Sequence, residues 1–192
     1  MKTARMEAFS DGVIAILITI MVLELHAPEN VTWQALRPIL PIFLAYVLSF
    51  IFLGIYWANH HHLLLLVDRV NGAILWANLH LLFWLSLIPF ATAWMGEHHS
   101  AAAPTALYGL VLLCAGAAYT ILQRALIREQ GPSSRLAKAV GRDVKALCSV
   151  AGYAIGIPSA FYNPAISQAI YIATALMWLV PDRRIEKAMR DG

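Results

Sequence analysis

The chain has 192 residues, of which 60% are hydrophobic and only 13% are charged, and its mean hydropathy is +0.65. Because a soluble domain carries about 25% charged residues, this composition argues against a soluble protein and places the chain in the membrane class. The net charge of +3 is no sign of nucleic-acid binding, since in a membrane chain the positions of the charges matter more than their sum.

The first candidate element is an apolar run over about residues 6–25, within the stretch RMEAFSDGVIAILITIMVLEL. A hydrocarbon core about 30 Å thick requires about 20 apolar residues of helix, so this run predicts a membrane span. Lys2 and Arg5 resemble the start of a signal peptide, but the run is too long, Asp11 interrupts its start and no A-x-A cleavage site follows. We therefore expect a retained span.

Five further apolar runs follow, and the segments between them are short. They lie at about residues 38–66, 71–96, 102–126, 144–161 and 164–181. Together with the first run they predict an all-α polytopic membrane protein with six transmembrane helices per chain and a single domain over residues 1–192. In the third span, Pro89 is expected to kink the helix, with nearby hydroxyl groups binding the carbonyl group that it frees.

The basic residues are distributed unevenly among the chain ends and loops. Only Arg37 falls in an odd-numbered loop, and the other thirteen Lys and Arg residues fall at the chain ends or in the even-numbered loops: Lys2, Arg5, Arg69, Arg124, Arg128, Arg135, Lys138, Arg142, Lys145, Arg183, Arg184, Lys187 and Arg190. Six spans place these thirteen on one face of the membrane, which the positive-inside rule makes cytoplasmic. We therefore expect both termini in the cytoplasm.

One face of the first span carries bulky aliphatic and aromatic side chains. On an ideal helix with about 100° per residue, four of them fall within roughly 60° of one another: Phe9, Ile16, Ile20 and Leu23. Gly12 and Thr19 lie at the edge of this stripe. Most stripes in so apolar a helix face lipid or other helices, and membrane threonines often bond to their own helix, so periodicity alone does not assign a pore.

Asp11 points away from this stripe, at about 140° from Ile16 on the same wheel. An ionisable group at a membrane span is costly to bury and is usually paired or functional. The carboxylate also lies in the first turns, where the positive end of the helix dipole stabilises it. Two interpretations stay open at this point, namely structural pairing with an Arg or His of another helix and direct involvement in transport.

The second span ends in YWANHHHLLLLVDR, which contains three consecutive histidines, His60, His61 and His62. Consecutive helical residues are about 100° apart, so the three side chains cannot share one face and form a poor metal site. We expect one of them to meet Asp11 or Ser10 at the cytoplasmic end of the bundle, and the others to lie at the interface or in solvent. We expect neither a metal nor a cofactor.

The residues Arg5, Phe9, Ser10 and Asp11 form the pattern R-x-x-x-F-S-D at the start of the first span. This pattern, and the GVIAILITIMVLEL that follows it, are similar to the first span of the transmembrane protein 175 family of endosomal and lysosomal potassium channels. The stretches YWANHHHLL and NLHLLFWLSLIPFATAW also resemble its second and third spans. The chain is thus identified as a bacterial, single-repeat member, expected in the bacterial inner (cell) membrane.

The resemblance implies a potassium-permeable cation channel without a pore loop. In such a channel the first helices surround the axis, and the matching side chains Ile16, Ile20 and Leu23 form a hydrophobic constriction that acts as gate and filter. The motif residues tie the first helix to its neighbours, and His60, His61 and His62 are candidate partners. A single repeat implies a homotetramer in the lipid bilayer that passes monovalent cations, with K⁺ as the permeant ion and Thr19 as a possible selectivity residue.

Other functions remain as alternatives. The main one is a proton-conducting or proton-coupled transporter that uses Asp11 and a span-two histidine, although the sequence offers no second intramembrane carboxylate to continue the path. A membrane enzyme or a metal transporter built on the histidines is a third class. No nucleophile–base pattern, Gly-rich phosphate loop or HExxH signature is present, so we expect no enzyme, and the missing TVGYG stretch excludes a carbonyl-lined potassium filter of the familiar kind.

Overall fold

The computed structural model describes residues 3–67, 69–140 and 144–179, and every regular element within them is helical. This confirms the predicted all-α class. Several basic residues used in the charge argument lie outside the described residues, as does the end of the sixth predicted span at 180–181. These basic residues are Lys2, Arg142, Arg183, Arg184, Lys187 and Arg190.

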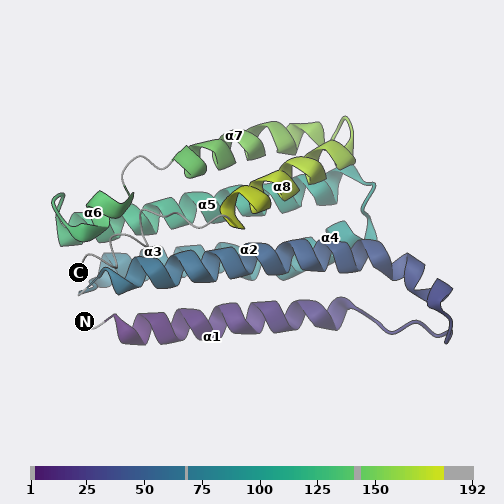
Figure 1. Cartoon of the computed structure of the whole chain (residues 1–192), viewed down its shortest axis with the longest axis horizontal. Helices are drawn as coiled ribbons and strands as arrows, with labels where there is room; N and C mark the ends of the chain where they lie inside the picture. Colours follow the sequence, from purple (N-terminus) through teal and green to yellow (C-terminus); the bar gives the residue numbers. More distant parts are fainter. Residues whose placement is uncertain (1–2, 68, 141–143, 180–192) are drawn as a thin grey trace.

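The helices lie alongside one another as an elongated bundle (Figure 1). In chain order they are α1 (Ala4–Met21), η1 (Val22–Glu24), η2 (Trp33–Ile39), α2 (Leu40–Leu65), α3 (Gly72–Ser86), α4 (Ile88–Glu97), α5 (Ala102–Gln130), α6 (Arg135–Val140), α7 (Val144–Ser159) and α8 (Pro164–Leu179). The six predicted runs correspond to α1–η1, η2–α2, α3–α4, α5, α7 and α8. The short helix α6 was not predicted, and α5 continues four residues beyond the expected end.

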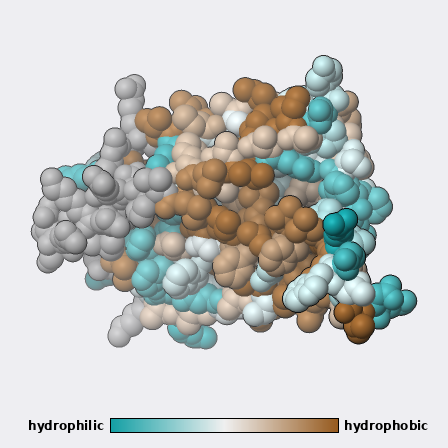
Figure 2. All heavy atoms as spheres, turned by 45° about the vertical axis from the view of Figure 1, so that its right-hand side comes forward, coloured by the Kyte–Doolittle hydropathy of each residue, from teal (hydrophilic) through white to brown (hydrophobic). Residues whose placement is uncertain are grey.

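Among the described residues, four helical segments are long and apolar enough to cross a bilayer, judged by length and composition. They are Ala4–Glu24, Trp33–Leu65, Gly72–Glu97 and Ala102–Gln130. The other two apolar helices, α7 and α8, have 16 residues each, which at 1.5 Å per residue gives about 24 Å of length. Figure 2 shows hydrophobic residues gathered over the middle of the face in view, with hydrophilic residues at the right and at the lower left.

Pro89 interrupts the third predicted span as expected. Helix α3 ends at Ser86 and α4 begins at Ile88, with Pro89 in its first turn, where a missing N–H group costs least. Two hydroxyl groups bind carbonyl oxygens around this break. Ser86 Oγ donates to Phe83 O at 2.7 Å, and Thr92 Oγ1 donates to Ile88 O at 2.7 Å. The carbonyl that Pro89 frees, four residues before it, is Leu85 O, and neither of these two hydroxyl groups binds it.

The second half of the bundle packs around one aromatic ring. Tyr171 of α8 is fully buried, and its hydroxyl group donates to Thr105 O of α5 at 3.3 Å. Gly109 of α5 and Gly156 of α7 both face this ring, and a Cβ atom at Gly156 would approach Tyr171 Cε1 to 2.8 Å. Small residues allow close helix contact in membranes, so these two glycines allow α5, α7 and α8 to close around the tyrosine.

The antiparallel arrangement gathers most described basic residues at one end of the bundle. The start of α1, the end of α2, the start of α3 and the end of α5 all lie at the left of Figure 1. The basic residues on or near these ends are Arg5, Arg69, Arg124, Arg128, Arg135 and Lys138. Arg37 lies in η2, at the opposite end of the bundle. The structure thus places these charges as the alternation of spans predicts.

Candidate functional site

Helix α1 has one face packed against the bundle and one face uncovered. The buried face consists of Met6, Ser10, Ile14, Leu17 and Met21. The predicted stripe lies on the other side, with exposed fractions of 54% for Phe9, 59% for Ile16, 44% for Ile20 and 70% for Leu23. A single copy of the chain therefore leaves the stripe without a protein partner within the described residues. Such a face suits either a pore between subunits or the lipid.

Thr19 lies on the exposed side of α1, beside Ile16. Its hydroxyl group donates to the helix's own carbonyl oxygens, at 3.1 Å from Ala15 O and 3.0 Å from Ile16 O. A hydroxyl oxygen that donates its hydrogen still has lone pairs to offer. Thr19 can therefore present an oxygen to a cation without breaking its bonds to the helix.

Ser10 begins a buried chain of hydrogen bonds that joins three helices. Its Oγ donates to Met6 O at 2.8 Å and accepts from Asn78 Nδ2 of α3 at 2.9 Å. Asn78 Oδ1 lies 2.8 Å from His60 Nε2 of α2. Because the amide nitrogen of Asn78 donates to Ser10, its oxygen must accept the proton on His60 Nε2. All three side chains are buried, so the chain of bonds fixes how α1 faces α2 and α3.

A second, more exposed set of contacts joins α1 to α2. Trp57 Nε1 donates to Asp11 Oδ1 at 3.0 Å. The Trp57 ring stacks on that of His61, with 6.1 Å between centroids, and His61 Nδ1 lies 2.9 Å from Glu7 Oε1. Glu7 and Asp11 are four residues apart, as are Trp57 and His61, so each pair lies on one face of its helix. These two faces meet.

The structure corrects the predicted partners of the motif. No histidine among the described residues bonds directly to Ser10 or Asp11: Asn78 lies between Ser10 and His60, and Asp11 binds the Trp57 indole in place of an Arg or His. The reason is the direction in which consecutive side chains leave α2, since His60 points toward α3 while His61 points toward α1. His62 is half-buried, with its ring 5.9 Å from that of His61.

The other two motif residues, Arg5 and Phe9, are exposed at the same end of α1. The sequence alone gave no role to Glu7, Trp57 or Asn78. The four-residue spacing of Glu7 and Asp11, and of Trp57 and His61, could have indicated two polar helix faces that meet. Within the part of the chain that the structure describes, no group of three His, Cys, Asp or Glu side chains is placed to hold a metal ion.

Comparisons with known proteins assign the family. The family model for the endosomal/lysosomal potassium channel TMEM175 matches residues 5–89. This range contains the motif and the hydrogen-bonded contacts of α1 with α2 and α3 described above. A potassium channel of a Chryseobacterium species is 54% identical over 192 residues, covering 100% of both chains. The chain belongs to the TMEM175 family. A potassium channel of Streptomyces collinus is also similar, at 30% identity over 193 residues, covering 92% of this chain and 91% of the relative.

A solved structure of the TMEM175 family has the same fold. It is the crystal structure of a lysosomal potassium-selective channel TMEM175 homolog from Chamaesiphon minutus, with a TM-score of 0.80 and 26% identity, covering 94% of this chain and 97% of that one. The chicken endosomal/lysosomal proton channel TMEM175 is 33% identical over 100 residues, which are 45% of this chain and 20% of the relative. The chain therefore spans only a small part of that vertebrate protein.

The buried Ser10–Asn78–His60 contacts lead to a first prediction. Replacing Asn78 by Ala leaves His60 Nε2 and Ser10 without the partner that joins them, and an unpaired buried polar group costs about 1–3 kcal/mol. We expect a lower midpoint of thermal unfolding in detergent and less assembled protein by size-exclusion chromatography. Ser159→Ala is the control, because the Ser159 hydroxyl donates to Ile155 O in its own helix. Equal midpoints for the two variants would show that the bridge does not hold α1.

Proposed function

We propose that this protein is a potassium-permeable cation channel whose pore is lined by α1. The observation that carries the proposal is the exposed aliphatic stripe of α1, opposite a face held by buried hydrogen bonds. The chain also has a relative of the same length that is named a potassium channel. A helix fixed on one side and uncovered on the other is suited to face the axis of an assembly.

The proposed topology has six crossings, formed by α1, η2–α2, α3–α4, α5, α7 and α8, with no pore loop. The two 16-residue helices are short for about 30 Å of hydrocarbon, and local thinning of the bilayer or longer ends would allow them to cross. The basic end of the bundle then faces the cytoplasm, with both termini there, in the bacterial cell membrane.

The proposed assembly is a homotetramer with α1 innermost. One copy contributes a single helix to the pore, and one helix cannot enclose an axis. We therefore expect four copies in native mass spectrometry and in crosslinking of the purified protein. A stable monomer or dimer that still conducts ions in liposomes would contradict this arrangement.

In this assembly Ile16, Ile20 and Leu23 form successive apolar rings along the axis. A narrow apolar ring offers little to replace the water around a cation, so it can gate by dewetting. Ions pass when water persists through the rings, and the Thr19 oxygen supplies one polar group beside Ile16. Glu24 and Glu29, both exposed beyond the far end of α1, raise the local concentration of cations. K⁺ is the proposed permeant ion, and no cofactor takes part.

The sharpest prediction concerns Ile16. Replacing it by Asn puts an amide in place of hydrocarbon at the constriction, so water should remain there and the barrier to a cation should fall. We expect K⁺ flux from liposomes to rise, with potassium preference over sodium weakened or unchanged. Flux and single-channel current measure this directly.

Ile18→Asn is the matched control for Ile16→Asn. Ile18 is two residues away on α1 and is partly buried against the core, so its replacement should harm packing and lower expression without raising flux. If both variants lose protein to the same extent and neither raises flux, Ile16 packs against a neighbour or lipid and does not form the constriction.

A second candidate function is proton-conducting or proton-coupled transport through Asp11 and a histidine of α2. It is favoured by the contact between Glu7 and His61 beside the bond between Asp11 and Trp57, and by chicken and human relatives that are named proton channels. The next buried polar cluster, Ser49–Thr92–Tyr108, argues against a path inside one subunit. Ser49 is eleven residues from His60 on α2, or about 16 Å.

Reversal potentials distinguish the two candidates. We expect the reversal potential of the reconstituted protein to follow a K⁺ gradient and to stay unchanged in a pH gradient.

Asp11→Asn and Arg5→Ala should reduce the amount of assembled protein more than they alter ion preference, because Asp11 faces Trp57 and not the exposed stripe. A reversal potential that follows pH in the wild type, and no longer does so in assembled Asp11→Asn, would establish proton transport instead.

A further inference from the structure

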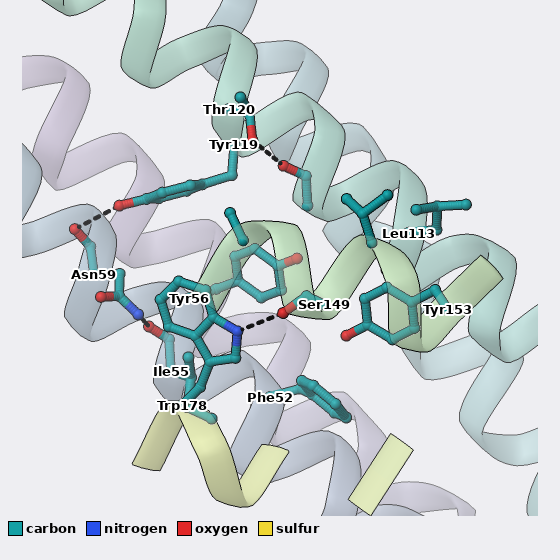
Figure 3. Close-up of a pocket in the computed structure, with 13 residues that line it drawn as sticks. Phe52, Ile55, Tyr56, Asn59, Leu113, Tyr119, Thr120, Ser149, Tyr153 and Trp178 are labelled. Atoms are coloured by element: carbon teal, nitrogen blue, oxygen red, sulfur yellow. Dashed lines mark hydrogen bonds between the residues drawn. The ribbon is translucent and has the colours of Figure 1, made fainter. Parts of the chain in front are cut away.

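A cavity of about 60 Å³ lies between α2, α5, α7 and α8 (Figure 3). Because one buried water needs about 10–15 Å³ of such space, the cavity has room for roughly four to six water-sized groups. Val150 of α7 lines it and is 48% exposed. Figure 1 shows α7 and α8 on the side of the bundle away from α1. In the proposed tetramer, this side faces the bilayer.

The lining of the cavity changes in polarity along the bundle axis. Toward the middle of the bundle it consists of apolar or aromatic side chains, among them Phe52 and Leu113. Toward the basic end it includes Asn59, Thr120 and Ser149, and the Trp178 indole donates to Ser149 Oγ at 2.8 Å. On α2 and α5, which both run toward the basic end, the order is the same, with Phe52 and Leu113 followed by Asn59 and Thr120. This order matches a lipid, with its chain toward the bilayer centre and its ester region nearer the surface.

Positive charge lies at the polar end of the cavity. The Lys145 ammonium group lies 5.6 Å from the centroid of the Trp178 ring, which lines the cavity. Arg124 is exposed on α5, one helical turn beyond Thr120 in the direction of the basic end. Basic side chains near a membrane surface attract anionic head groups.

We propose that this cavity binds an anionic phospholipid of the leaflet at the basic end of the bundle. Part of one acyl chain enters between α2, α5 and α7, and the head group lies near Lys145 and Arg124. The mostly apolar lining holds hydrocarbon better than ordered water, which needs several polar partners. That the cavity faces the bilayer rests on the proposed tetramer. Lipid binding is measured without a conduction assay, so its failure can be distinguished from a failure of the proposed channel function.

The test compares two lipids with the same acyl chains, phosphatidylglycerol and phosphatidylcholine, added to delipidated full-length protein in detergent. Native mass spectrometry counts bound lipids, and thermal unfolding reports stabilisation, since a ligand that binds the folded state raises the midpoint. We expect phosphatidylglycerol to remain bound and to raise the midpoint more than phosphatidylcholine does. Lys145→Gln should reduce the preference for phosphatidylglycerol about fivefold and leave binding of the acyl chain intact.

Gly116→Leu is the variant that blocks the cavity. A Cβ atom at Gly116 meets Tyr56 Oη at 3.7 Å, an ordinary contact, so the leucine enters the cavity without displacing the backbone. We expect this variant to keep its oligomeric state and to lose the bound lipid. Ala117→Leu is the matched control, since Ala117 is the next residue of α5, is exposed and does not line the cavity.

Three results would overturn the proposal. The first is equal binding of the two lipids by the wild type, and the second is unchanged lipid binding by Gly116→Leu. The third is a Gly116→Leu protein that dissociates into single chains while Ala117→Leu remains assembled. That result would mean that a neighbouring copy, and not a lipid, fills the cavity.

Discussion

The rotation of α1 about its own axis depends on a buried set of hydrogen bonds. Ser10, Asn78 and His60 are each too polar to be buried alone in an apolar bundle, and each has a partner in another helix. Turning α1 by one residue, about 100°, would separate Ser10 from Asn78 and bring a different face outward. The position of the exposed stripe of Ile16, Ile20 and Leu23 therefore follows from a contact at the other side of the same helix.

These bonds act through geometry more than through total energy. A hydrogen bond between membrane helices contributes about 0.6 kcal/mol on average, because the unfolded chain in the membrane also finds partners. The cost of leaving one buried partner unpaired is larger, about 1–3 kcal/mol. A wrong orientation of α1 therefore raises the free energy by more than the correct hydrogen bonds lower it. The contacts of Asp11 with Trp57 and of Glu7 with His61 add to this at the more exposed side.

The bundle separates two kinds of surface. Helix α1 presents aliphatic side chains with one polar oxygen, from Thr19, and this composition suits a barrier that depends on hydration of the ion. The opposite side, formed by α7, α8 and parts of α2 and α5, closes around Tyr171 but leaves a cavity near the basic end. Two glycines of α5 make this possible. Gly109 leaves room for the Tyr171 ring, and Gly116 lines the cavity. A lipid in that cavity would contact α2, the helix that also holds α1 through Trp57 and His61.

The sequence by itself determined the helical class, the family and the approximate bounds of the helices, because these depend on local quantities: the length of apolar runs, the break at Pro89 and the R-x-x-x-F-S-D pattern. It also determined which side chains share the exposed face of α1, since a helix of known period orders its own residues. Only the tertiary structure decided that Asn78 stands between Ser10 and His60, and that Trp57, not a histidine, binds Asp11. These contacts join residues 18 to 68 positions apart, and their choice depends on the relative rotation and height of packed helices. No periodicity within one helix contains that information, because each helix satisfies its own backbone bonds at every rotation.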